Sequence, residues 1–140
     1  MTSAASDMSG SLAYVDSSAL LKLLFAEDES ATFEAVISEW PDLVSSTILE
    51  VEVHRAAYRE DLDPAAVDVI VDAVSLMDVD TAIRRVARRF GPATLRGMDA
   101  IHLATAASLG TDLGVLFTYD IRMLDGALLE GLPAWAPKPS

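Results

Sequence analysis

Four carboxylates stand in apolar stretches of this chain, where a soluble protein usually avoids a charge. Two of them end apolar runs, one opens an apolar segment, and one lies in the hydrophobic stripe of an expected helix; in chain order they are Asp16, Glu52, Asp99 and Asp120. An unpaired carboxylate is costly to bury, and too few cationic residues lie near these four in the sequence to pair them all. We therefore expect them to gather into an acidic pocket that binds a hard divalent cation.

The chemistry of such a pocket follows from its ligands. Carboxylate oxygens favour Mg²⁺ or Mn²⁺ over zinc, and Mg²⁺ keeps several waters when it binds a protein. A bound water of lowered pKa can attack a phosphodiester in line, so phosphodiester hydrolysis is the expected reaction. The two histidines, His54 and His102, show no zinc-ligand spacing, and we expect them to be surface or packing residues.

Glu52 is the least ordinary of the four. The helix expected to end near Arg59 has one apolar arc, which is formed by Ile48, Leu49, Val53 and Ala56. At about 100° per residue, Glu52 falls inside this arc, whereas Glu50 points to the opposite side and is expected in solvent. The alternative interpretation of Glu52 is an intrahelical ion pair with Arg55 or Arg59, of a kind that contributes little to stability.

Each aspartate also has an ordinary interpretation. Asp99 at a helix start, and Asp16 before the first helix, are typical capping residues. Asp120 is typical of the beginning of a turn. These roles are compatible with metal binding, because a carboxylate has more than one acceptor site. Taken singly, the two interpretations are balanced, and the joint placement of the four favours the functional one.

Short apolar runs alternate with helical patterns, which predicts a parallel sheet covered on both faces. Strands are expected at 12–15, 43–45, 76–79 and 115–118, with a short edge strand at 132–135. Helices are expected at 19–25 with Ser17 or Ser18 as the cap, at 29–39, from Ser46 or Thr47 to 59, and at 65–74, 81–90 and 99–110. Ligands of open parallel sheets bind beyond the carboxyl ends of the strands, and Asp16 and Asp120 both occupy that position.

Arginines cluster on the helix expected at 81–90. Arg84, Arg85, Arg88 and Arg89 form a basic ridge there, and Arg96 lies just beyond it. A solvated face that balances the acidic remainder is one interpretation, and contact with a nucleic-acid backbone is the other. Arg122, two residues after Asp120, is better placed to reach a phosphate, and the hydroxyl of Ser17 could hydrogen-bond one.

Length and composition limit the protein class. The 140 residues, 51% of them hydrophobic, are enough for one domain, expected at 12–136, and no apolar run approaches the roughly 20 residues of a membrane span. Residues 1–11 are small and polar, so we expect a disordered tail rather than a secretion signal. The absence of cysteine is compatible with the cytoplasm. A net charge of −12 disfavours a nucleic-acid binder unless cations offset it, and it also suits a basic protein partner.

Four segments together resemble the PIN-domain ribonucleases, specifically the VapC toxins of bacterial toxin–antitoxin pairs. The resemblance runs from about Leu12 to Pro133 and is carried by the segments 14–22, 52–56, 95–104 and 118–122, with Asp-Ala-Ile-His-Leu-Ala in the third as the most specific. It implies a three-layer α/β/α sandwich around a mostly parallel sheet of four to five strands. Position by position, it also implies that Asp16, Glu52, Asp99 and Asp120 bind Mg²⁺ or Mn²⁺ and cleave RNA.

The resemblance further implies partners. Toxins of this kind form homodimers and are blocked by a cognate antitoxin, in a larger complex in which an antitoxin segment enters the acidic groove. The candidates for phosphate contact in the substrate are Ser17, Arg96 and Arg122. Two other functions stay open on sequence grounds. One is a degenerate domain that only binds proteins, and the other is an aspartyl-type phosphatase, which is disfavoured because Ser18 occupies the position of its second aspartate.

Overall fold

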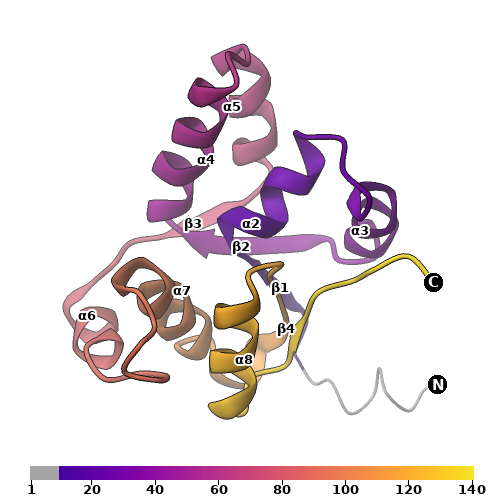
Figure 1. Ribbon diagram of the computed structural model, residues 1–140. Helices are drawn as coiled ribbons and strands as arrows, with labels where there is room; N and C mark the ends of the chain where they lie inside the picture. The colour runs from indigo at the N-terminus through magenta and orange to yellow at the C-terminus, as the bar shows by residue number, and fades with distance from the viewer. Residues whose placement is uncertain (1–9) are drawn as a thin grey trace.

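A parallel sheet forms the centre of the molecule (Figure 1). The computed structural model describes residues 10–140, and within them the sheet has five strands in the order β3-β2-β1-β4-β5. Their bounds are β1 Leu12–Val15, β2 Asp42–Ser46, β3 Ser75–Met77, β4 Leu113–Phe117 and β5 Ala134–Trp135. Every neighbouring pair is parallel, which confirms the predicted sheet and its short edge strand.

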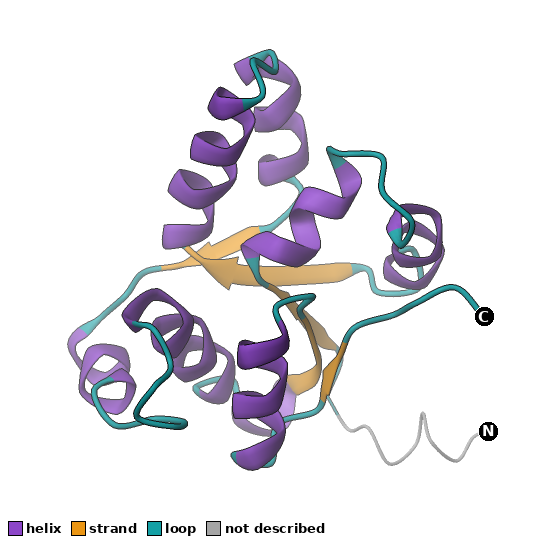
Figure 2. Ribbon diagram, in the orientation of Figure 1, coloured by secondary structure: helices purple, strands orange, loops and turns teal. Residues whose placement is uncertain are grey.

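Helices cover both faces of this sheet, so that the fold has three layers (Figures 1 and 2). One face carries α2 Ser17–Leu20, the 3-10 turn η1 Leu21–Leu23, α3 Ser30–Ile37, α4 Ile48–Arg59 and α5 Pro64–Asp72. The other face carries α6 Thr81–Ala87, α7 Gly97–Ala107 and α8 Ile121–Leu129, and the 3-10 turn η2 Gly110–Asp112 leads into β4. The three-layer α/β/α sandwich is confirmed.

The two hydrophobic cores follow from the alternation of side chains along the strands. In β1, Ala13 and Val15 point to the core under α2–α5, whereas Tyr14 points to the core under α7 and α8. In β4, Phe117 lies in the first core and Leu116 in the second. Successive residues of a strand face opposite sides, so a strand buried on both faces is apolar throughout. This is why β1 and β4 could be recognised as short uninterrupted apolar runs.

Most predicted boundaries differ from the observed ones by one to three residues, and three differences bear on the candidate site. The first helix was expected at 19–25 with a serine cap, but Asp16 itself caps α2, which ends at Leu20 and passes into η1. The helix expected from Asp99 begins two residues earlier, so Asp99 lies in its first turn rather than at its cap. Helix α8, which Asp120 caps, was not predicted.

The expected tail at 1–11 lies outside the described residues except for Gly10 and Ser11, and the former is buried. No helix within residues 10–140 is long and apolar enough to span a membrane.

Gly114 allows a close contact at the start of β4, and its replacement tests the packing there. A Cβ at this position would meet the Gly10 carbonyl oxygen and would lie 2.6 Å from the Trp40 ring. Gly114→Ala should therefore lower the free energy of unfolding by about 1–3 kcal/mol in urea denaturation. Gly97→Ala is the matched control, because nothing lies within 4 Å of its Cβ position. The control should gain about 0.4–1 kcal/mol, and equal stability of the two variants would contradict this packing.

Candidate active site

The carboxyl ends of two central strands bring the first and last carboxylates to one rim. β1 and β4 are adjacent, and after a register shift between Leu12 and Ala13 their carboxyl ends align with Val15 opposite Phe117. Asp16 follows β1 directly, and its backbone N–H donates to the Phe117 carbonyl at 3.2 Å. Asp120 follows β4 after two further residues and caps α8. The two aspartates predicted at the strand ends thus begin two helices that leave the same edge of the sheet.

Asp16 is held in one orientation by its hydrogen bonds. Its side chain is buried, with 3% exposure. Oδ1 accepts from the Ser18 hydroxyl at 2.7 Å and from the Ala19 N–H at 2.9 Å, and Oδ2 accepts from the Thr118 hydroxyl at 2.6 Å. A carboxylate has about four acceptor positions, so Oδ2 keeps one for another partner. Burial raises the pKa of Asp16, and nearby His102 and these hydrogen bonds oppose that shift.

Glu52 is paired with a histidine rather than with an arginine of its own helix. His102, on α7, is 1% exposed, and its Nε2 lies 2.7 Å from Oε1 of Glu52. Its Nδ1 lies 2.7 Å from the hydroxyl of Tyr14. Burial raises the pKa of Tyr14, so the phenol keeps its proton. Both ring nitrogens of His102 are therefore paired, Nε2 with a carboxylate and Nδ1 with a phenol.

This arrangement disagrees with the alternative interpretation of Glu52 and corrects the expectation for His102. Within residues 10–140 neither Arg55 nor Arg59 forms an ion pair with Glu52. His102 had been expected at the surface or in ordinary packing, yet it contacts one carboxylate of the quartet and acts electrostatically on two others, Asp16 and Asp99. The available sequence signal was its position three residues after Asp99, which places both on one side of α7. His54 does lie at the surface, where it contacts Asp68 at 2.9 Å.

Asp99 lies in the first turn of α7, in a field of like charge. Partial burial raises its pKa most, and the charges of Asp120 and Glu52 raise it further, against the opposing effects of His102 and Arg96. These interactions show that Glu52, Asp99 and Asp120 share one region. In the described part of the chain, no lysine or arginine forms an ion pair with any member of the quartet. No close ion pair within the described residues therefore neutralises these carboxylates, although the charge of Arg96 acts on Asp99 from a greater distance.

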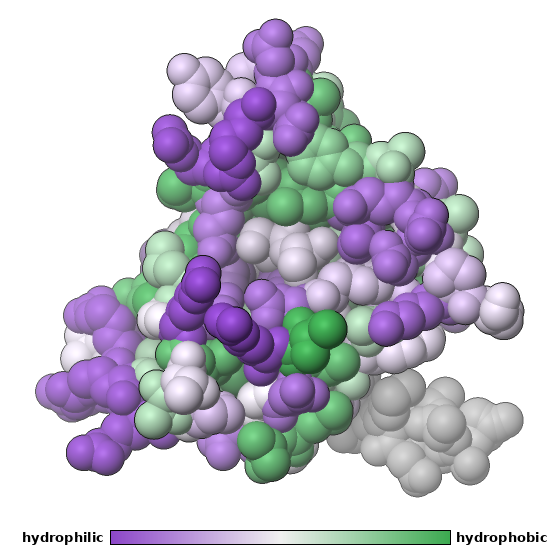
Figure 3. All heavy atoms as spheres, in the orientation of Figure 1, coloured by the Kyte–Doolittle hydropathy of each residue, from purple (hydrophilic) through white to green (hydrophobic). Residues whose placement is uncertain are grey.

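Three of the four carboxylates line one groove of about 1280 Å³, and Asp16 lies outside its lining. Hydrophilic side chains gather between α4 on one side and α7 and α8 on the other (Figure 3). The three residues proposed for phosphate contact, Ser17, Arg96 and Arg122, all line this acidic groove. Two more arginines that the sequence did not single out for it, Arg55 and Arg59, line it as well.

The donor set is chemically suited to a hard divalent cation. All four groups offer carboxylate oxygen, and Asp16 keeps a free acceptor position. Burial and, after it, the charges of Asp120 and Glu52 raise the pKa of Asp99. Within residues 10–140, no group of three or more aspartate, glutamate, histidine or cysteine side chains is arranged so that it could hold a metal ion. The assignment of the quartet as metal ligands therefore stays a prediction, supported by its chemistry and its charge.

Comparison with known proteins gives a consistent result. A family model described as PIN domain matches residues 13–127. Ribonuclease VapC46 of Mycobacterium tuberculosis is 39% identical over 125 residues, which cover 89% of this chain and 96% of that protein. Ribonuclease VapC47 of the same species is 33% identical over 130 residues, with the same coverage of 89% and 96%. A solved toxin–antitoxin complex from Klebsiella pneumoniae superposes with a TM-score of 0.69 at 20% identity, covering 91% of this chain and 99% of that one.

Repulsion in the groove can be tested through stability. Without divalent cations at neutral pH, Asp99→Asn should raise the free energy of unfolding by on the order of 1 kcal/mol, because the neutral amide removes a repelled charge. A raised folded-state pKa disfavours the charged form, so the gain should be absent at low pH. It should grow as the pH rises from the ordinary value of 3.8 through the raised pKa of Asp99. Urea denaturation at several pH values measures it.

The control for this experiment is Asp125→Asn, since Asp125 is exposed on α8 outside the groove lining. It should change stability little at any pH. Added Mg²⁺ should then raise the melting temperature of the unaltered protein more than that of Asp99→Asn, because binding to the folded state stabilises it. Equal Mg²⁺ shifts in the two proteins would contradict a role for Asp99 in metal binding.

Proposed function

This chain belongs to the PIN-domain family, and from that premise we propose that it is a metal-dependent endoribonuclease of the VapC kind, a toxin that a cognate antitoxin neutralises. One observation carries the proposal. The buried His102 contacts Glu52 and acts electrostatically on Asp16 and Asp99, and the charge of Asp120 acts on Asp99 as well. No lysine or arginine in residues 10–140 forms an ion pair with any of these four carboxylates. Such a site suits divalent cations and phosphate oxygens better than an organic cofactor.

Asp16, Glu52 and Asp99 would hold the first Mg²⁺ or Mn²⁺, and Asp120 would complete the site or help to position a second ion. When bound, such an ion supplies charge neutralisation and a water of lowered pKa for attack on the phosphodiester. The protein's part is to present oxygens in fixed orientations. Thr118, Ser18 and the Ala19 N–H fix the carboxylate of Asp16, and the Tyr14–His102 pair fixes Glu52. Partners of this kind orient the ligands themselves.

The arginines of the groove would bind the substrate. Arg96 and Arg122 lie in its lining beside Asp99 and Asp120, so that phosphates flanking the cut bond would meet guanidinium groups while the cut bond faces the acids. The hydroxyl of Ser17 would donate a further hydrogen bond to a phosphate oxygen. This separation of roles explains how a chain of net charge −12 would hold a polyanion.

An antitoxin partner is supported by the fold relative from Klebsiella pneumoniae, which was solved as a toxin–antitoxin complex. We propose that a basic antitoxin side chain enters the groove and pairs with Glu52, Asp99 and Asp120, where a cation would otherwise bind. A homodimer, and a larger complex with antitoxin, belong to the same proposal. The exposed apolar residues Val51 and Tyr58 on α4, with exposures of 59% and 75%, are available for such contacts.

Paired glutamate variants test the proposed function. Glu52→Gln should lower the rate of RNA cleavage by about 100-fold or more, because the neutral amide no longer supports the cation. Glu50→Gln is the matched control, since Glu50 is exposed on the same helix and outside the groove. The measurement is cleavage of purified cellular RNA by antitoxin-free protein, with the cut sites mapped. Asp16→Asn and Asp99→Asn should likewise abolish cleavage while the protein stays folded.

The rival interpretations give different results in this assay. A degenerate binding module would show no cleavage that depends on Mg²⁺ or Mn²⁺, and an aspartyl-type phosphatase would release inorganic phosphate without cutting the chain. Cleavage that survives Glu52→Gln or Asp99→Asn in a clean preparation, or that persists in EDTA, would contradict the proposed site.

A further inference from the structure

The arginines of this protein are confined to two places. The sequence has eight, of which Arg55, Arg59, Arg96 and Arg122 line the acidic groove, and Arg84, Arg85, Arg88 and Arg89 lie on α6 and the turn that follows it. We name the second set the arginine ridge. Between Thr81 and Met98 the chain has five arginines and no acidic residue, although its net charge is −12. A uniformly solvated surface would not be expected to segregate charge in this way.

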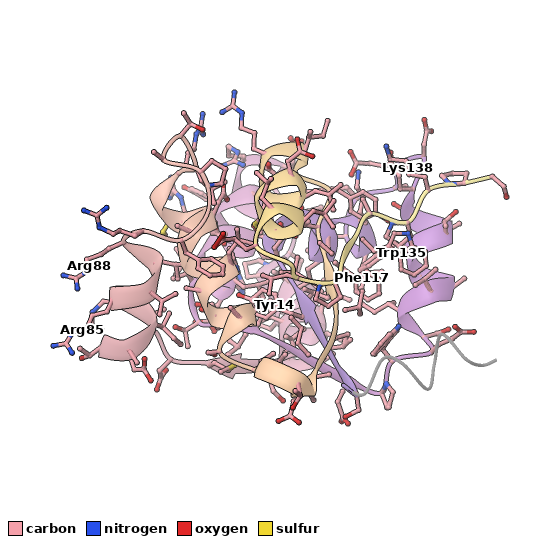
Figure 4. The ribbon with its side chains drawn as sticks, turned by 90° about the horizontal axis from the view of Figure 1, so that it is seen from below. Tyr14, Arg85, Arg88, Phe117, Trp135 and Lys138 are labelled. Atoms are coloured by element: carbon pink, nitrogen blue, oxygen red, sulfur yellow. The ribbon has the colours of Figure 1, made fainter. Side chains whose placement is uncertain are left out.

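Three of the four arginines of the ridge are available to bind a ligand. All four of its arginines are exposed, and within residues 10–140 none of them forms an ion pair. Arg85 and Arg88 extend outward on the side of the molecule opposite Lys138 (Figure 4). Arg84 differs from the others, because its guanidinium donates to the Val79 carbonyl at 2.7 Å and to the Thr81 hydroxyl at 3.1 Å. The remaining three have no such bond among the described contacts.

The ridge is continuous with the groove. Arg85, Arg88 and Arg89 line a second hollow of about 740 Å³, together with the loop from Phe90 to Ala93. Gly97, at the start of α7, lines both this hollow and the acidic groove, and Arg96 beside it lines the groove. A basic path therefore leads from the ridge over the first turn of α7 to Asp99.

We propose that Arg85, Arg88 and Arg89 form a second RNA-binding site, which holds the phosphate backbone on one side of the bond that the groove cleaves. The proposal rests on the proposed function, because the path ends at the predicted cleavage site. Guanidinium groups bind phosphate oxygens without reading the sequence, so the ridge acts on affinity and register. An acidic protein segment is the other ligand that such charge suits. RNA is favoured because the ridge and the groove share a border.

The test compares a triple variant, Arg85→Gln with Arg88→Gln and Arg89→Gln, with two charge controls. Arg84→Gln removes one positive charge from the ridge, but from an arginine whose guanidinium is already bonded to the Val79 carbonyl. Lys138→Gln removes one exposed positive charge from the opposite side of the molecule. Fluorescence anisotropy in EDTA would measure binding to oligouridylates of about 30 and about 6 nucleotides. The longer oligonucleotide can reach both the groove and the ridge, whereas the shorter one covers only one of them. Cleavage of cellular RNA in Mg²⁺ would be measured in parallel.

The triple variant should bind the longer oligonucleotide at least about tenfold more weakly at low salt, and the slope of log affinity against log salt should fall by about 2 for three lost phosphate contacts. Its KM for long RNA should rise while kcat is unchanged, and both single controls should stay close to the unaltered protein.

Unchanged binding and KM in the triple variant would overturn the ridge as an RNA site, even if cleavage by the groove is intact. The ridge would also be overturned as an RNA site if the triple variant bound a polyglutamate peptide, which represents the acidic protein segment, more weakly but bound RNA as before. Ridge-dependent binding without any cleavage would support the ridge and contradict the proposed function.

Discussion

The burial of the Asp16 carboxylate at the end of β1 is the constraint on which the rest of the rim depends. A charge with 3% exposure is tolerable only when its acceptor positions are used, and three donors meet it. One is the N–H of Ala19 in α2, so the first helix must leave the sheet at this point. Another is the hydroxyl of Thr118, which lies at the end of the neighbouring strand. The same contact that satisfies Asp16 therefore ties β1 to β4 and sets where Asp120 begins α8.

His102 extends this constraint to the helices. Its two ring nitrogens join the phenol of Tyr14, on β1, to the carboxylate of Glu52, on α4, from a position on α7. These three elements come from both helical layers and the sheet between them. A buried chain of hydrogen bonds is stabilising only when every member is paired, so a shift of α4 relative to α7 would leave a buried polar group unsatisfied. The burial and the neighbouring charges that raise the pKa of Asp99 are therefore held in place by a rigid frame.

The sequence predicted the strands and the quartet because both depend on local patterns. β1 and β4 are short apolar runs that end in a charge, and Glu52 interrupts an apolar arc of known period. His102 could not be assigned in the same way, since its partners Tyr14 and Glu52 are 88 and 50 residues away. Helix α8 was missed because Asp120 is equally typical of a turn, and its capping bond to the Met123 N–H is a single local contact. The burial of Asp16 was expected to require a cation, yet two hydroxyls and one backbone amide donate hydrogen bonds to its carboxylate and occupy most of its acceptor positions.

The distribution of charge explains how an acidic molecule can present a surface to a polyanion. The segment between Thr81 and Met98 has five arginines and none of the 22 acidic residues, so every formal charge within it is positive despite the net charge of the chain. Screening limits surface electrostatics to roughly 10 Å at ordinary ionic strength, and local composition therefore outweighs the total. Repulsion by the acidic remainder would also discourage RNA from settling elsewhere on the surface. A polyanion approaching this protein would accordingly meet attraction along one path, and that path ends at the carboxylates that a cation would neutralise.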